Sequence, residues 1–80
     1  MPKVPPSKPR EVISAFKRLG YTERKSKSGH VILVKPGARP LSVPVARGDV
    51  KTGTLHSLID AAGITPEEFL EALRGKKGRR

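Results

Sequence analysis

His30 is the residue of this chain best suited to transfer a proton near neutral pH. It is one of only two histidines, and the chain contains no cysteine. Imidazole takes up and releases protons near neutral pH, as a general acid or base must do. His30 follows a stretch rich in lysine, arginine and glycine and precedes the apolar residues 31–34. This order predicts a proton-transferring side chain held between a basic turn and a strand; without such chemistry, the same stretch would be a basic hairpin.

The charge of the chain is strongly positive and unevenly distributed. The formal net charge is +10, from 17 lysine and arginine residues against 7 aspartate and glutamate residues. Residues 1–10 and 75–80 carry basic side chains and no acid, and residues 17–51 carry nine basic side chains against Glu23 and Asp49. This segregation favours a phosphate-bearing partner such as nucleic acid over charge kept only for solubility.

Cleavage of RNA is a reaction that these residue types would suit. RNA supplies its own nucleophile, the 2′-hydroxyl, so the protein must supply a proton acceptor, a proton donor and positive charge beside the phosphorane. His30 would act as the acceptor or the donor. The candidate RNA-binding residues are cations and the backbone N–H groups of the turn, namely Arg24, Lys25, Lys27, Ser28, Gly29, Arg47 and Lys51.

Metal-dependent chemistry is not expected. No paired carboxylates stand close together in the basic half of the sequence, so a two-metal mechanism would lack ligands. His56 and Asp60 are four residues apart on a predicted helix and are interpreted as an exposed surface pair. We therefore expect no metal site and no other cofactor.

The length and composition predict one small domain in the cytoplasm. Eighty residues leave no room for a second core, and without cysteine no disulfide can stabilise the first. A partner protein or self-association is the expected aid to stability. No window approaches the ~18 apolar residues of a membrane span, and residues 1–9 lack the apolar run of a signal peptide.

The hydrophobic pattern predicts a helix, three strands and two further helices. Residues 10–19 carry a helical apolar stripe that ends at Gly20, and residues 21–26, 30–35 and 41–45 form short strands separated by turns. The third strand lies at a sheet edge or ends at Pro44, because proline cannot donate to a ladder. Residues 55–62 form a helix capped by Thr54, and residues 65–74 open with a capping box.

The expected fold is a two-layer α+β domain over residues 10–74, in which helices cover one face of an antiparallel meander. Residues 1–9 are predicted to be a flexible, basic, proline-rich arm, and residues 75–80 a flexible basic tail. The second face of the strand at residues 31–34 is either partly covered or an interaction surface. The predicted core consists of Val12, Ile13, Phe16, Leu19, Leu55, Leu58, Ile59, Phe69 and Leu73.

From about residue 10 to residue 70, the sequence resembles the HicA (YcfA-like) family, the mRNA interferase toxins of type II toxin–antitoxin systems. The order and spacing of several short motifs carry this resemblance: Leu19-Gly20-Tyr21, Ser28-Gly29-His30, Val43-Pro44, Gly53-Thr54-Leu55, Ala62-Gly63-Ile64-Thr65 and Glu67-Glu68-Phe69-Leu70.

The resemblance implies a fold like that of double-stranded RNA-binding domains, with an α-β-β-β-α layout and a short extra C-terminal helix. It also implies a cytoplasmic endoribonuclease that cleaves mRNA, with His30 in the position of the family histidine. A HicB-type antitoxin would hold such a toxin inactive in a hetero-oligomer. The sequence differs from the family in the order Ser28-Gly29 and in Ala46, where many members carry a second histidine. Arg47 is the candidate to replace that histidine in contacting RNA.

Three functions remain open at this point. The first is a metal-independent ribonuclease toxin, and the second is an RNA-binding module without catalysis, since such folds read duplex RNA by its shape. The third is a protein-interaction domain whose basic face meets an acidic partner. A neighbouring gene that encodes a small antitoxin would favour the first.

Overall fold

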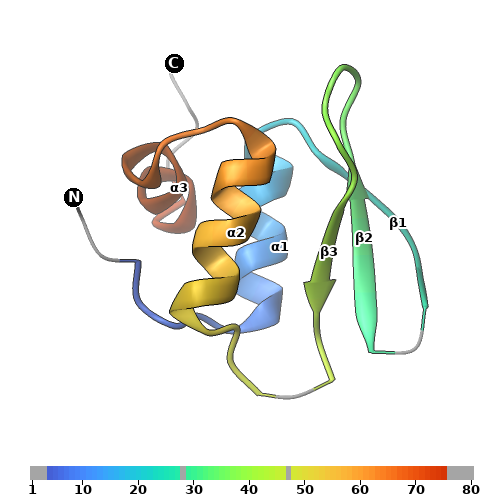
Figure 1. Cartoon of the computed structure of the whole chain (residues 1–80), viewed down its shortest axis with the longest axis horizontal. Helices are drawn as coiled ribbons and strands as arrows, with labels where there is room; N and C mark the ends of the chain where they lie inside the picture. The colour runs from blue at the N-terminus through green and yellow to red at the C-terminus, as the bar shows by residue number, and fades with distance from the viewer. Residues whose placement is uncertain (1–3, 28, 47, 76–80) are drawn as a thin grey trace.

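The computed structural model describes residues 4–27, 29–46 and 48–75, and for residues 25–27 it describes only the backbone. Six elements follow one another along the chain: α1 (Pro9–Arg18), β1 (Thr22–Lys27), β2 (His30–Val34), β3 (Leu41–Pro44), α2 (Thr52–Ala62) and α3 (Pro66–Leu73). This order confirms the predicted α+β succession of one helix, three strands and two further helices (Figure 1).

The three strands form an antiparallel sheet in the order β1-β2-β3. His30, the first residue of β2, pairs with Lys27 of β1 on one side and with Pro44 of β3 on the other. The β1–β2 ladder has an irregularity between Arg24 and Lys27. β3 is an edge strand, as Pro44 predicts, because its missing N–H would break a ladder on the other side.

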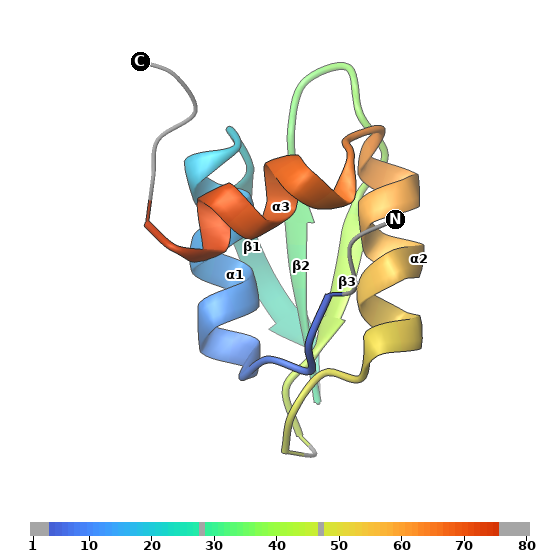
Figure 2. The same ribbon diagram turned by 90° about the vertical axis from the view of Figure 1, so that its left-hand side faces the viewer.

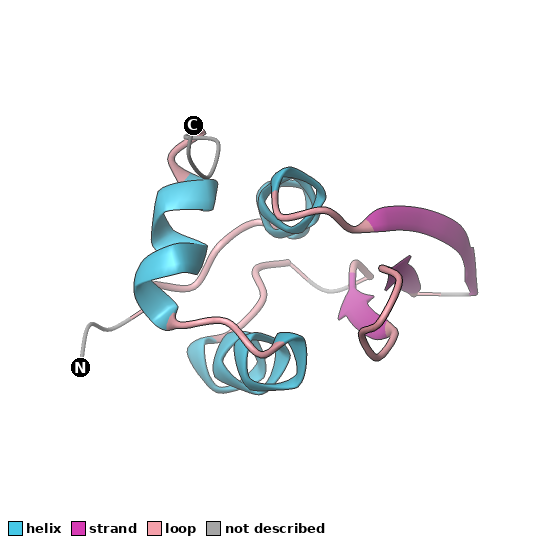
Figure 3. Cartoon of the chain, turned by 90° about the horizontal axis from the view of Figure 1, so that it is seen from above, coloured by secondary structure: helices cyan, strands magenta, loops and turns pink. Residues whose placement is uncertain are grey.

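Side chains of β2 alternate between a buried face and an open face of the sheet. Val31 and Leu33 are buried, whereas His30 is exposed and Ile32 and Val34 are half-buried. α1 and α2 lie together on one side of the sheet, as seen from above in Figure 3. The helices thus cover the face of Val31 and Leu33, whereas no helix within residues 4–27, 29–46 and 48–75 covers the apolar groups on the other face.

Local sequence signals fix the helix ends. Gly20 follows α1 with φ +106°, a value that glycine adopts without strain, and Lys35 Nζ donates to the Leu19 carbonyl oxygen at 3.1 Å. α3 begins with the predicted capping box: the Thr65 hydroxyl accepts from the Glu68 N–H, and the Glu68 carboxylate accepts from the Thr65 N–H.

The N-terminal segment differs from the sequence prediction of a flexible arm. Val4 is fully buried, and Ser7 forms an isolated antiparallel bridge with Val50. The Val50 N–H donates to the Ser7 carbonyl oxygen at 2.7 Å, and the Ser7 N–H donates to the Val50 carbonyl oxygen at 3.2 Å. Residues 4–8 therefore belong to the folded domain, because their backbone pairs with a loop more than forty residues away in sequence.

α2 begins earlier than predicted, and its first residue binds the same N-terminal segment. α2 starts at Thr52 after Lys51 as N-cap, so the prediction that Thr54 caps it is wrong. The Thr52 hydroxyl donates to the Val4 carbonyl oxygen at 2.9 Å. The Thr52 side chain thus hydrogen-bonds the N-terminal segment and does not cap α2.

α3 lies across α1 and α2 on the side away from the sheet (Figure 2). The rings of Phe16 and Phe69 lie 5.3 Å apart between centroids, and Arg18 Nη1 donates to the Ala72 carbonyl oxygen at 2.7 Å. Of the predicted core, Ile13, Leu19 and Leu73 are only partly buried and pack against it, whereas the other members are buried: Val12, Phe16, Leu55, Leu58, Ile59 and Phe69.

Tyr21 is buried at the junction between α1 and β1. Its ring packs edge-on against Phe16 with centroids 5.5 Å apart, and Lys35 Nζ lies 5.5 Å from its centroid. The hydroxyl oxygen has no hydrogen-bond partner within the described part of the chain. Burial raises the pKa of Tyr21 above the ordinary value of 10.0, because the tyrosinate ion would lose its hydration there.

We predict that Tyr21 titrates above pH 10 in the native protein and near pH 10 after unfolding. The unfolded state then releases this proton at lower pH than the folded state, so the free energy of unfolding falls as the pH rises through 10. Tyr21 is the only tyrosine, so tyrosinate absorbance in native buffer and in guanidinium measures both values directly. Equal midpoints in the two solvents would contradict the prediction.

Tyr21→Phe is the matched variant. It removes a buried hydroxyl that has no hydrogen-bond partner among the described residues, so at pH 7 the free energy of unfolding should stay the same or rise. Above pH 10 the variant should lose less stability than the wild type, since lysine titration is common to both proteins. Denaturant melts at pH 7 and pH 11 test both statements.

Candidate nucleic-acid interface

His30 lies at the start of β2 on the open face of the sheet, where its side chain is exposed. His30 begins a strand that is paired on both sides, with Lys27 of β1 and Pro44 of β3 as its partners, so its backbone position is well defined. The imidazole can therefore meet a large ligand at the sheet surface without the backbone having to move.

The turn before His30 is joined to the loop that follows β3. Gly29 has φ +81°, in the region that favours glycine. Its carbonyl oxygen accepts a hydrogen bond of 2.8 Å from the Val45 N–H. A Cβ added to Gly29 would lie 3.2 Å from the Ala46 Cβ, which is tighter than most real Cβ contacts. Ala46 is therefore packed directly against the turn that carries His30.

The open face carries Arg24 and a small apolar patch on the same side of the sheet as His30. Directly paired residues share a face of an antiparallel sheet, so Arg24 lies on the same side as its partner Ile32. Ser42 also pairs with Ile32, and Pro44 pairs with His30. Arg24 is exposed and Ile32 is half-buried. This surface can thus combine one cation, one imidazole and limited apolar contact.

Two turns and two helix N-termini meet at one end of the domain. Figure 1 shows the β1–β2 turn, the loop after β3 and the first turns of α1 and α2 at the same end. Lys51, the N-cap residue of α2, is exposed there, and its neighbour Val50 is fixed by the bridge to Ser7. Helix N-termini carry partial positive charge. This basic end of the domain therefore attracts anions more strongly than its charged side chains alone would.

The structure places some of the predicted site residues and leaves others outside its description. It places His30, Gly29, Arg24 and Lys51 on the open face or at the basic end, where an anionic ligand could meet them. Ser28, Arg47 and the side chains of Lys25 and Lys27 lie outside the described residues, so their roles stay predictions.

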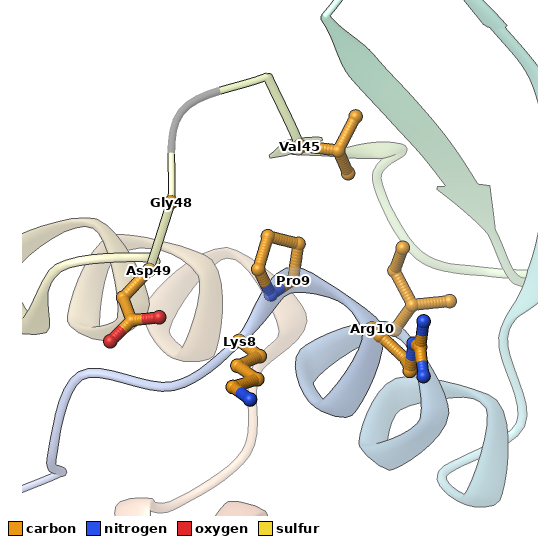
Figure 4. Close-up of a pocket in the computed structure, with 7 residues that line it drawn as sticks. Lys8, Pro9, Arg10, Val45, Gly48 and Asp49 are labelled. Atoms are coloured by element: carbon orange, nitrogen blue, oxygen red, sulfur yellow. The ribbon is translucent and has the colours of Figure 1, made fainter.

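A groove next to the turn that precedes His30 was not predicted from the sequence. It has a volume of about 540 Å³ and runs between the start of α1 and the loop after β3. Figure 4 shows its walls: Lys8, Pro9 and Arg10 on one side and Val45, Gly48 and Asp49 on the other. The only sequence signal was a proline flanked by two cations at a helix start, which by itself indicates no groove.

The remaining candidate, the pair His56 and Asp60, lies on α2, on the other side of the sheet from His30. Within the described ranges, no three histidine, aspartate or glutamate side chains gather closely enough to hold a metal ion. No helix in the described part of the chain has the length and apolar character that a bilayer span needs.

Comparison with known protein families identifies the family of this chain. A protein-family model described as the HicA toxin of bacterial toxin–antitoxin matches residues 9–64. These residues include α1, the whole sheet and α2, and thus His30 and the turn before it. No curated protein matches the chain.

We predict that Gly29→Ala destabilises the protein more than Gly37→Ala. The two glycines have nearly equal φ values, +81° and +80°, so each substitution should cost about 1–2 kcal/mol of left-handed backbone strain. Only Gly29 has a neighbour within 4 Å of the added Cβ, because Gly37 faces open space. Melting temperatures measure the difference, and amide resonances of His30 and Val45 should shift only in Gly29→Ala. Equal losses of stability in the two variants would contradict the prediction, because they would show that Ala46 moves away from the added Cβ without an energetic cost.

Proposed function

Because this chain belongs to the HicA toxin family of bacterial toxin–antitoxin systems, we propose that it is an endoribonuclease that cleaves mRNA in the cytoplasm without a metal ion. The observation that supports this best is the exposed imidazole of His30, which begins a paired strand at the basic end of the domain. The excess of cations, +10 over the whole chain, suits a polyanionic substrate.

In the proposed reaction, His30 acts as the general base. The imidazole removes the proton of a ribose 2′-hydroxyl, and the oxygen attacks the adjacent phosphorus. A bond forms between phosphorus and the 2′-oxygen, and the bond to the 5′-oxygen of the next nucleotide breaks. The products are a 2′,3′-cyclic phosphate and a 5′-hydroxyl, so this step consumes no water molecule and needs no redox cofactor.

Positive charge around the phosphorus supplies the rest of the rate enhancement. Arg24 lies on the same face of the sheet as His30, and the first turn of α2, with Lys51, lies at the same end of the domain. Cations placed before the reaction stabilise the charge that develops on the phosphorane oxygens. Lys25, Lys27 and Arg47 are proposed to add to this field, with the backbone N–H groups of Ser28 and Gly29 as further donors.

This toxin would work with one histidine where many relatives of its type carry two. Ala46 occupies the position in question and packs against Gly29. The proton for the leaving 5′-oxygen would then come from solvent or from a cation near His30, including Lys51. A non-catalytic RNA-binding module, which needs the same basic surface but no base, is the alternative that the first experiment below separates.

We propose a HicB-type antitoxin as the partner that holds the toxin inactive in a hetero-oligomer. The open sheet face offers what such a partner could cover: the half-buried Ile32 and Val34 next to the exposed His30. Covering apolar groups that no helix shields would stabilise a chain of this size while blocking the site.

We predict that His30→Ala abolishes RNA cleavage and growth arrest while leaving the fold and RNA affinity nearly intact. Loss of a general base typically lowers the rate by about 10²–10⁴. His56→Ala is the matched control, because it removes the other histidine from a different side of the domain and should change the rate little. Cleavage of a defined RNA in EDTA, with mass analysis of the ends, measures rate and product together.

Two results would contradict this mechanism. A folded His30→Ala protein that cuts RNA at the wild-type rate would remove His30 from the reaction. A wild-type protein that binds RNA and never cuts it would favour the RNA-binding module. Products that end in a 3′-hydroxyl would exclude attack by the 2′-hydroxyl.

We predict that the product of the adjacent antitoxin gene protects His30 from diethyl pyrocarbonate. Modification of His30 should slow at least several-fold in the purified complex, because the partner would cover the open sheet face. His56 serves as the internal reference, since α2 lies on the opposite side of the sheet. Unchanged reactivity of His30 in a stable complex would mean that inhibition acts elsewhere.

A further inference from the structure

The groove between the start of α1 and the loop after β3 has the size of a small-molecule site. Its volume of about 540 Å³ lies within the roughly 300–1,000 Å³ of typical ligand pockets. Pro9 and Ile13 of α1 form one wall, and Val45 forms part of the other. Val45 is the one large hydrophobic side chain that counts as exposed among the described residues, at 37%.

The rim of the groove is positively charged on the α1 side, where a phosphate could bind. Lys8 and Arg10 are both exposed and flank Pro9 at the start of α1 (Figure 4). Asp49 is the single acid among the lining residues and lies on the loop side. An apolar wall with cations at its edge matches a nucleotide, whose base presents an apolar face and whose phosphate is anionic.

The groove adjoins the turn that carries His30. The Val45 N–H donates to the Gly29 carbonyl oxygen at 2.8 Å, so the groove wall and the residue before His30 are joined by one hydrogen bond. His30 faces the open side of the sheet and the groove lies on the α1 side, so an RNA strand with a phosphate at His30 would place a neighbouring nucleotide in the groove by passing around this end of the sheet. A paired base could not enter, because its faces are stacked within the duplex.

We propose that this groove binds the base of an unpaired nucleotide next to the cleaved bond, with Lys8 and Arg10 near its phosphate. The inference rests on the proposed ribonuclease function and adds to it that the substrate is single-stranded at this position. A fold of this layout would then read RNA by base contact as well as by duplex shape.

The test uses a binding probe that cannot be cut. A five-residue uridine oligonucleotide with 2′-O-methyl riboses lacks the nucleophile, and the full chain is labelled at its Val and Ile methyl groups. Titration should shift the methyl resonances of Val45 and Ile13, since a base packed on them imposes its ring current. The same oligonucleotide with abasic riboses should bind through its phosphates and leave these methyl groups unshifted.

Two pairs of variants measure the energetic contribution. Val45→Ser should weaken the affinity for the uridine probe about fivefold or more, the lower end of what one base contact provides, and should not change the affinity for the abasic probe. Arg10→Glu should weaken binding several-fold more than Arg39→Glu, which makes the same charge change on the β2–β3 turn at the opposite end. Arg10→Glu should also keep the fold, because an acid suits the first turn of a helix.

Three outcomes would overturn the inference: probe binding without shifts at Val45 and Ile13, equal effects of the two arginine variants, or binding of duplex RNA alone. Cleavage of natural RNA by the wild type is measured separately. A protein that shows the methyl shifts but cuts no RNA loses the proposed catalysis and keeps the groove, so the two failures are distinguishable.

Discussion

The packing of α1 and α2 on a single face of a three-stranded sheet is the constraint on which the rest of this structure depends. A chain of 80 residues has apolar side chains for one core, and Val31, Leu33, Phe16 and Leu55 are committed to it. The alternating side chains of β2 then emerge on the uncovered face, where His30 and Ile32 lie. The same connection of strands to helices brings the starts of α1 and α2 to the end where His30 begins its strand.

Sequence reasoning succeeded where the cause was local. The left-handed Gly20, the Thr65 capping box and the edge position of Pro44 follow from the conformations that these residues allow. It failed where the cause was distant. No local pattern within residues 4–8 predicts that their backbone pairs with Val50, because this bridge depends on the position of the loop before α2.

The candidate site also has one part that local chemistry suggests and other parts that depend on distant segments of the chain. His30 could be named from chemistry alone, since few side chains exchange protons near neutral pH and this one follows a basic turn. The groove could not be named, because its two walls are separated by more than thirty residues in the chain and its apolar side depends on Val45 staying outside the core. The packing of Ala46 against Gly29 was equally hidden, since it depends on the path of the loop after β3.

The contact of α3 with α1 has a consequence for how the protein is made on the ribosome. Phe69 and Ala72, near the end of the described chain, meet Phe16 and Arg18 in the first helix. Until α3 has left the ribosome, the side of α1 that it covers stays exposed, and the domain cannot complete its core. A nascent chain truncated before α3 would therefore lack the stable scaffold that holds His30. An interrupted translation product that ends before α3 should therefore stay unfolded and be harmless to the cell that makes it.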